Sequence, residues 1–173
     1  MASTTTVTLL PDAGPLITLA YADALDLLLK PGWSVALVDM VLHEVTRNQT
    51  PTSTRIAAWA RENSIPVLAT NIYHRYREAG TTSSARKANL GELAIQEAMS
   101  GFSLAADQTG VFLFEDHKIA RASFLLPDNC RKVSTRAFLL FMEQQDLVDS
   151  ATEIERRAIL AGRQFSQIRF PPE

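Results

Sequence analysis

The sequence predicts an α/β domain built on a mostly parallel sheet. Short apolar runs typical of buried strands alternate along the chain with stretches whose apolar residues have helical spacing. Three acidic side chains follow predicted strands directly, and the carboxyl ends of parallel strands are where ligands bind in such sheets. Two of these acids lie about 30 residues apart, roughly the length of one strand–helix–strand crossover. This pattern places them on the same edge of the sheet.

Length and composition indicate a single domain over residues 1–173. The chain is 46% hydrophobic and 21% charged, and no apolar run approaches the roughly 20 residues of a membrane span. The N-terminus has neither a basic start nor an apolar segment, so we expect no signal peptide and no anchor. Cys130 is the only cysteine, which excludes an internal disulfide and fits a reducing cytosol. A soluble, cytoplasmic protein is the expectation.

The first predicted strand carries Val7, Leu9 and Leu10 and ends at Asp12. Gly14 and Pro15 then begin a helix, because proline at the first helical position lacks only an N–H that would be unpaired there. Asp12 is therefore a candidate site residue at the carboxyl end of a strand. The alternative, that it only organises the turn, stays equally open at this point.

Residues 21–30 predict a second short helix, and residues 35–38 a second strand. Asp39 then caps a helix that carries Glu44 among its inward apolar residues. A helix over residues 50–63, with Ile56, Trp59 and Ala60 on one face, precedes a brief strand at residues 66–68. Residues 71–87 are polar and basic without an apolar period, so we predict a surface loop or an irregular helix.

A helix over residues 89–101 is predicted by an apolar stripe of Leu90, Leu93, Ala94 and Ala98. Glu92 stands three residues after Asn89, the spacing of a capping box, so a structural role is an alternative for it. Residues 110–114 predict the fourth strand, followed by Glu115 and Asp116. Residues 117–122 begin another helix, for which Asp116 could be only the N-cap.

The C-terminal part is predicted to contain a minimal fifth strand at Val133 and two helices. The first follows Ser134 and Thr135 and turns Phe138, Leu139 and Met142 inward. The second opens with a capping-box pattern at residues 152–155 and ends at Gly162. We expect residues 150–173 to pack on the domain as a final helix and tail.

Four carboxylates, Asp12, Glu44, Glu92 and Asp116, are predicted to converge at one rim. Their mutual repulsion would make an empty, fully ionised cluster unstable, so it needs protons or a cation. Oxygen ligands favour Mg²⁺ or Mn²⁺ with bound water retained. Such a site suits phosphodiester hydrolysis, in which the metal activates water and stabilises charge on the phosphate.

Other chemistries lack their sequence patterns. The chain contains no GxxxxGK[ST] loop and no GxGxxG after a strand, which argues against a P-loop or a dinucleotide site. No second aspartate follows Asp12 two residues on, as an aspartyl-phosphate phosphatase of the DxD kind would require. No Ser-His-Asp, Cys-His or zinc-spaced histidine pattern competes, although His43 and His117 each adjoin a candidate carboxylate.

Four segments resemble the PIN-domain nucleases, in particular the prokaryotic VapC-like toxins and related PIN proteins. They are PDAGPLITLA around Asp12, VLHEV around Glu44, NLGELAIQEA around Glu92 and LFEDHKIARA around Asp116. The resemblance implies a three-layer α/β/α sandwich and a Mg²⁺- or Mn²⁺-dependent endoribonuclease. It makes these four acids the metal-binding and catalytic residues, with Ser134 or Thr135 as polar support. Many relatives have an acid where this chain has Asn89 and an aspartate where it has Glu115, so Glu115 is either a peripheral acid or a harmless substitution.

The expected partners follow from charge and from the same resemblance. A nuclease of net charge −2 must place cations around its metals, and we assign RNA contacts to Arg75, Arg77, Arg86 and Lys87. The resemblance implies the toxin of a type II toxin–antitoxin pair, with an antitoxin protein as a possible partner. Four leucines within residues 25–29 cannot all face one small core, which suggests a homodimer. The alternative function is a non-catalytic PIN-like module that binds RNA or a protein.

Overall fold

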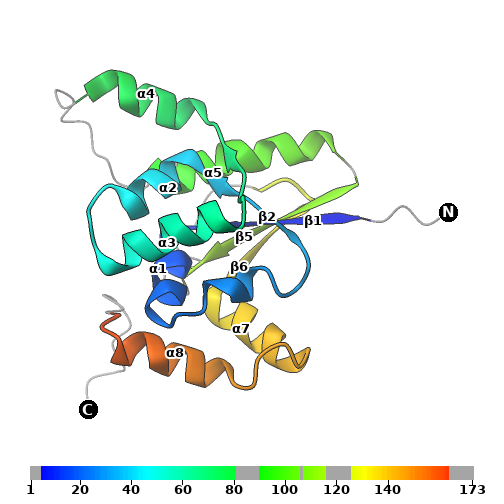
Figure 1. Cartoon of the computed structure of the whole chain (residues 1–173). Coiled ribbons are helices and arrows are strands. Elements are labelled where there is room, and N and C mark those ends of the chain that lie inside the picture. Colours follow the sequence, from blue (N-terminus) through cyan, green and yellow to red (C-terminus); the bar gives the residue numbers. More distant parts are fainter. Residues whose placement is uncertain (1–4, 81–89, 106, 116–125, 164–173) are drawn as a thin grey trace, which may run out of the picture.

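A computed structural model describes residues 5–80, 90–105, 107–115 and 126–163. Its central sheet has four parallel strands in the order β2-β1-β5-β6. Figure 1 shows α4 and α5 above this sheet and α7 and α8 below it, so the chain is a three-layer α/β/α sandwich. The strands are β1 (Thr6–Pro11), β2 (Ser34–Val35), β3 (Leu37–Val38), β4 (Val67–Leu68), β5 (Gln108–Phe114) and β6 (Cys130–Ser134).

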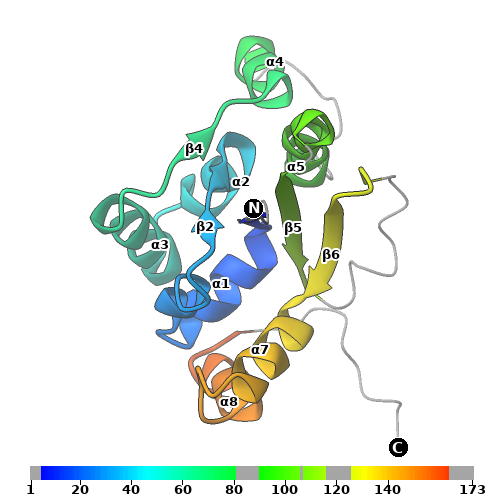
Figure 2. The same ribbon diagram turned by 90° about the vertical axis from the view of Figure 1, so that its right-hand side faces the viewer.

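The predicted α/β class with a mostly parallel sheet is thereby confirmed. The helices of the described residues agree with most of the predicted segments and connect the strands as crossovers (Figure 2). They are α1 (Ala13–Tyr21), η1 (Leu25–Leu28), α2 (Asp39–Thr46), α3 (Pro51–Glu62), α4 (Asn71–Ala79), α5 (Leu90–Ser100), η3 (Gly101–Leu104), α7 (Thr135–Gln144) and α8 (Ala151–Leu160). No helix in these ranges is long and apolar enough to cross a membrane.

β1 and β5 form the centre of the core. They pair along their whole length, from Thr6 opposite Gln108 to Pro11 opposite Leu113. Leu9 and Leu10 of β1 and Phe112 and Phe114 of β5 are fully buried, because helices cover both faces of the sheet. Their carboxyl ends therefore lie side by side on the most rigid part of the molecule.

The predicted second strand, residues 35–38, is divided into two short strands in different sheets. The backbone N–H of Ala36 still donates to Leu9 O in β1, at 3.1 Å, whereas that of Leu37 donates to Pro66 O, at 2.9 Å. The chain thus changes its partner at this point, and β3 pairs in parallel with β4. The resulting two-stranded sheet supports the start of α2.

The predicted second helix over residues 21–30 is wrong, since α1 extends to Tyr21 and only a 3₁₀ turn, η1, follows. Leu25, Leu27 and Leu28 are buried and Leu29 packs against the core. A short 3₁₀ turn enclosed between neighbouring helices can direct three successive positions inward. The leucine patch offered as the reason for a dimer therefore does not exist, although the dimer itself remains an untested prediction.

Where a surface loop or an irregular helix was predicted at residues 71–87, the first half forms a regular helix, α4. Thr70 caps it, because its Oγ1 accepts from Tyr73 N at 3.2 Å. Two carboxylates anchor the same end: Asp39 accepts from Thr70 N at 2.7 Å, and Glu97 of α5 accepts from Asn71 N at 2.7 Å. These tertiary contacts stabilise a helix that its own sequence does not predict, because the segment has no apolar stripe. Residues 86 and 87 lie outside the described residues.

Helix α5 is confirmed, but its predicted inward face is partly wrong. Leu93 is 45% exposed, whereas Gly91, Ala94, Ile95 and Met99 are the buried positions. The helix is rotated so that Gly91 can approach α2, which turns Leu93 outward. The predicted capping box cannot be examined at Asn89, which lies outside the described residues.

β6 is a five-residue strand rather than the minimal one predicted at Val133, and α7 is confirmed with Phe138, Leu139 and Met142 buried. The capping box predicted at residues 152–155 is wrong. α8 begins instead after Ser150, whose Oγ accepts from Glu153 N at 3.2 Å. Glu155 pairs with Arg136 at 3.1 Å, so it is not available to cap. α8 packs against α1 and α7.

Candidate functional site

Asp12 follows β1 at the centre of the sheet. Its backbone N–H donates to Leu113 O of β5 at 2.9 Å, which extends the pairing of the two strands past Pro11. It occupies the N-cap position of α1, but its side chain makes no capping hydrogen bond. The side chain is nevertheless only 1% exposed. The structure thus places a buried carboxylate at the carboxyl end of a central strand, the edge where parallel sheets bind ligands.

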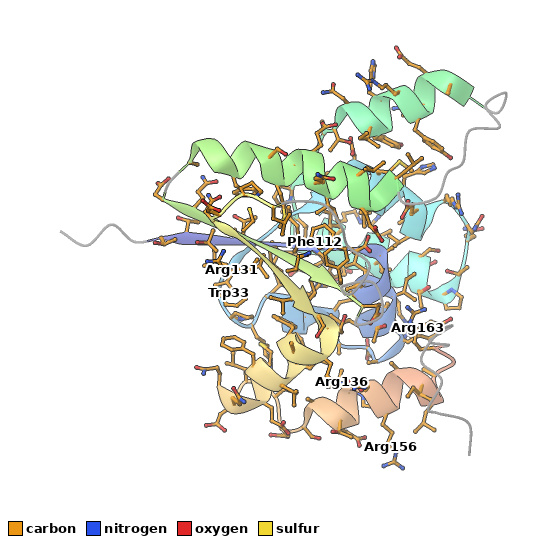
Figure 3. All side chains as sticks on the ribbon, turned by 180° about the vertical axis from the view of Figure 1, so that it is seen from behind. Trp33, Phe112, Arg131, Arg136, Arg156 and Arg163 are labelled. Atoms are coloured by element: carbon orange, nitrogen blue, oxygen red, sulfur yellow. The ribbon has the colours of Figure 1, made fainter. Side chains whose placement is uncertain are left out.

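Glu115 follows β5 and is 4% exposed. The hydroxyl of Thr18 in α1 donates to Glu115 Oε1 at 2.5 Å, and a guanidinium nitrogen of Arg163 lies 3.5 Å from the same oxygen. Arg163 Nε also donates to Thr18 Oγ1 at 3.0 Å. Figure 3 places Arg163 beyond the end of α8, beside α1. The three side chains form a closed polar cluster, Thr18–Glu115–Arg163, which ties the end of β5 to α1 and to the C-terminal helix.

Gly14 makes room for Glu115 in the first turn of α1. A Cβ atom at position 14 would lie 2.3 Å from Glu115 Cγ, a separation that real atoms do not adopt. The absence of a side chain is therefore what lets the Glu115 stem cross this turn. The glycine that the sequence pattern explains as a helix start thus has a packing role.

Glu44 approaches the first turn of α5 in a similar way. Gly91 N donates to Glu44 Oε1 at 3.2 Å, and a Cβ at position 91 would lie 2.8 Å from Oε2. The first N–H groups of a helix have no partner within it, and they carry the positive end of the helix dipole. The Glu44 carboxylate is half-buried there. Glu92, which follows Gly91 in the chain, is also half-buried.

The structure separates the predicted acids that it describes into two sets. Asp12 and Glu115 follow the paired strands β1 and β5, whereas Glu44 contacts Gly91 at the start of α5, where Glu92 is the next residue. Asp116 lies outside the described residues. In the part of the chain that the structure describes, no three His, Cys, Asp or Glu side chains are close enough together to hold a metal ion. A complete ligand set would thus require residues beyond that part, such as Asp116, or movement of these side chains.

Ser134 and Thr135, predicted as polar support, contact the backbone around the strand ends. Ser134 Oγ accepts from Ala137 N at 3.0 Å and caps α7. The buried Thr135 donates its hydroxyl to Phe114 O at 3.1 Å. Thr135 therefore holds the backbone of Phe114, the residue that precedes Glu115, whereas Ser134 fixes the start of α7.

Cys130 begins β6 and is buried. Burial raises the pKa of its thiol, which makes Cys130 a packing residue rather than a nucleophile.

The predicted basic segment contributes Arg75 and Arg77, both exposed on α4. Arg86 and Lys87 lie outside the described residues. Beside the arginines the structure adds a feature that charge alone does not reveal. His43 of α2 packs beside the rings of both Tyr73 and Tyr76, at centroid distances of 5.5 and 5.3 Å.

Sequence reasoning missed Thr18, Arg163 and this aromatic group. Thr18 has only the signal of a polar residue at an inward position of α1, and Arg163 is an ordinary arginine after a helix. Neither reveals its partner, because Glu115 is 97 residues from Thr18 and 48 from Arg163. A comparison with models of known protein families found no match, and neither did a search of curated proteins.

Proposed function

We propose that the chain is a metal-dependent endoribonuclease that hydrolyses RNA phosphodiester bonds. The observation that carries the proposal is the position of the buried Asp12, which stands at the carboxyl end of a central parallel strand, beside the end of β5. That position is where parallel α/β sheets bind ligands.

The residues present fit Mg²⁺ or Mn²⁺. Asp12, Glu44, Glu92 and Asp116 are the ligands we propose, and all four offer only oxygen, the donor that these ions prefer. Gly91 holds Glu44 by a backbone N–H and leaves space for its second oxygen. When bound, the ion would supply a more acidic water and positive charge beside the phosphate.

The Thr18–Glu115–Arg163 cluster has a positioning role in this proposal. Arg163 offsets the charge of Glu115, so that this acid adds little repulsion next to Asp12. The same contacts fix the end of β5 against α1, the helix whose start carries Asp12. The charge of Glu115 is thus offset by Arg163, while the neighbouring Asp12 is the acid that we assign to the metal ion.

A second candidate function is a PIN-like module that binds RNA or a protein without catalysis. The paired state of Glu115 favours it, as does the lack of a three-residue ligand group within residues 5–80, 90–105, 107–115 and 126–163. The narrower assignment to a toxin of a type II toxin–antitoxin pair, with an antitoxin partner, rests on the resemblance to VapC-like proteins alone, and so does the homodimer. A cytoplasmic location is proposed from the single cysteine, which fits a reducing compartment.

Asp12→Asn provides the direct test. The change removes a charge with almost no change in volume, so we expect RNA cleavage with Mn²⁺ to fall at least about 100-fold while the fold is retained. Calorimetric titration should show saturable Mn²⁺ binding in the parent and none in the variant. The melting temperature without metal should not decrease, because a repulsive carboxylate has been removed.

Asp149→Asn, which alters an exposed acid between α7 and α8, is the matched control and should cleave and bind as the parent does. Parental cleavage by Asp12→Asn would show that the site is elsewhere. A folded parent that binds RNA but neither binds Mn²⁺ nor cleaves would favour the non-catalytic module.

A further inference from the structure

Helix α4 presents an aromatic and basic surface, which consists of His43, Tyr73, Tyr76, Arg75 and Arg77. The rings of Tyr73 and Tyr76 are nearly parallel, with an interplanar angle of 21° and centroids 6.4 Å apart. The guanidinium carbon of Arg77 lies 5.8 Å from the centre of the Tyr73 ring, within the range of a cation–π contact. Tyr73, Tyr76 and Arg77 are three and four residues apart and so share a helix face, whereas Arg75 is exposed on a neighbouring face of the same helix.

This surface lies at the edge of the hydrophobic core. Tyr73 and Tyr76 pack against the core, but α4 buries no residue completely, and Tyr73, Tyr76 and His43 are each partly exposed. Arg75 and Arg77 are exposed on the same helix. Core packing therefore accounts for only part of each tyrosine ring, and the partly exposed rings beside two exposed arginines form a surface that a ligand can reach.

The helix is also held in a fixed position. Asp39 binds Thr70 through both its backbone N–H and its hydroxyl, at 2.7 Å each, and Glu97 accepts from Asn71 N and Ile72 N at 2.7 and 3.2 Å. These carboxylates face the start of α4, while the arginines lie further along it. The aromatic and basic surface is thus presented in one orientation, next to the α2–α5 contact that carries Glu44.

We propose that this surface binds single-stranded RNA, with bases stacking on Tyr73, Tyr76 and His43 and with phosphates paired to Arg75 and Arg77. Aromatic rings stack on unpaired bases of any sequence, and arginine can bind a phosphate with two hydrogen bonds. His43 immediately precedes Glu44, so the surface leads directly to one of the proposed ligands. That the bound RNA continues from this surface toward the acids rests on the proposed nuclease function. That its bases stack on the rings does not depend on that function.

Charge favours a polyanion as the occupant of this surface, and the clustered rings favour RNA over an acidic peptide. α4 carries two arginines against one glutamate, and that Glu78 lies 3.2 Å from His74. An acidic peptide would match the arginines but would gain less from three clustered rings than a chain of bases would. An acidic protein segment is therefore the competing occupant that the experiment must separate.

The test measures RNA binding in EDTA, so that catalysis and metal play no part. A fluorescein-labelled octauridine is titrated with the full chain and followed by anisotropy. We expect the double variant Tyr73→Leu/Tyr76→Leu to bind at least about tenfold more weakly, because leucine keeps apolar packing but cannot stack. Tyr73→Phe/Tyr76→Phe retains the rings and should bind within about twofold of the parent, provided both variants melt as the parent does.

The arginines are tested by salt dependence. Arg75→Gln/Arg77→Gln should weaken binding and reduce the slope of log affinity against log salt by roughly 1.4, since each phosphate of a single strand that is no longer neutralised removes about 0.7. Arg156→Gln is the control for loss of a distant positive charge, since Arg156 is exposed on α8 below the sheet, away from α4 (Figure 3). It should leave the affinity and the salt slope unchanged.

Three outcomes would overturn the inference: parental affinity in the leucine variant, equal losses in the leucine and phenylalanine variants, or displacement of the RNA by a polyglutamate peptide at lower concentration than by unlabelled octauridine. Failure of the nuclease proposal is distinguishable from these results. In that case RNA binding in EDTA would still depend on the tyrosine rings, while no Mn²⁺-dependent cleavage would be found in the parent.

Discussion

Two carboxylates of this protein lie against the first turn of a helix at a glycine, yet their surroundings differ. Glu115 crosses α1 at Gly14 and is almost completely buried, with Thr18 and Arg163 as partners. Glu44 reaches α5 at Gly91, is half-buried, and accepts a hydrogen bond from a backbone N–H. The same local arrangement thus holds an acid whose charge is offset by an arginine, Glu115, and a more accessible acid, Glu44.

The difference lies in what offsets the charge. A buried carboxylate is tolerated when a cation and a hydroxyl satisfy it, and Glu115 has both. The partners of Glu44 that the structure gives include a helix N-terminus, whose partial positive charge is smaller than that of a guanidinium. We therefore expect perturbation of the Glu115 region to change mainly the stability of the fold, and perturbation of the Glu44 region to change mainly metal binding.

Arg163→Met should have the largest effect on stability. It leaves the Glu115 charge buried without its cation, and we expect the free energy of unfolding to fall by about 2–3 kcal/mol, less than the roughly 3–5 kcal/mol for a fully buried pair because Arg163 is partly exposed. Urea denaturation of the metal-free protein measures this change.

Arg156→Met is the matched control for that experiment. Arg156 lies 3.7 Å from Glu153 in an exposed pair, so its loss should cost less than about 0.5 kcal/mol. A similar effect of the two changes would contradict a structural role for Arg163. Arg163→Lys, which keeps the charge but not the planar geometry, should fall between the parent and Arg163→Met.

Gly14→Ala should have the second largest effect. The added Cβ would lie 2.3 Å from Glu115 Cγ, and the anchored carboxylate cannot move aside without losing Thr18 or Arg163. We expect a loss of about 1–2 kcal/mol, since overpacking costs roughly 1–3 kcal/mol and alanine recovers part of it through its higher helix propensity. If Gly14→Ala is as stable as the parent in urea, the Glu115 cluster is less rigid than its contacts imply.

Gly91→Ala should have the smallest effect on stability, and it should lower the affinity for Mn²⁺. The nearest atom to the new Cβ would be the terminal Glu44 Oε2, at 2.8 Å, and the end of a half-buried side chain can move. We expect the free energy of unfolding to change by less than about 0.5 kcal/mol, because displacement of Glu44 and gain of helix propensity offset each other. Mn²⁺ affinity, measured by calorimetry, should fall about three- to tenfold as Glu44 shifts.

The comparison of Gly91→Ala with Gly14→Ala therefore tests most directly whether Glu44 and Glu115 have different roles. If Gly91→Ala destabilises the fold as much as Gly14→Ala and leaves Mn²⁺ affinity at the parental value, the two carboxylates have equivalent structural roles. The functional distinction between the two regions would then be wrong.

Much of the fold could be predicted because strong local patterns agreed with the tertiary structure. The apolar runs that became β1 and β5 and the stripe that became α3 were correctly assigned to their elements. The placement of Asp12 at a strand end followed from the same patterns. In these segments the residues that prefer to be buried are the ones that the structure buries.

Prediction failed where groups distant in sequence decide the outcome. α4 has no apolar stripe, and its start is held by Asp39 and Glu97 from two other helices. Leu93 continues an apolar pattern, but the approach of Gly91 to Glu44 sets the rotation of α5 and turns Leu93 outward. Periodicity describes one helix at a time and contains no information about such neighbours.

By itself the sequence determined the α/β class, the parallel sheet and the strand-end position of Asp12, because hydrophobic periodicity and turn residues act locally. Only the tertiary structure decided that Glu115 is neutralised by Arg163 while Glu44 rests on a helix N-terminus, and that His43 joins Tyr73 and Tyr76. The physical reason is that the charge balance of a buried acid and the stacking of rings depend on groups that folding brings together from distant parts of the chain.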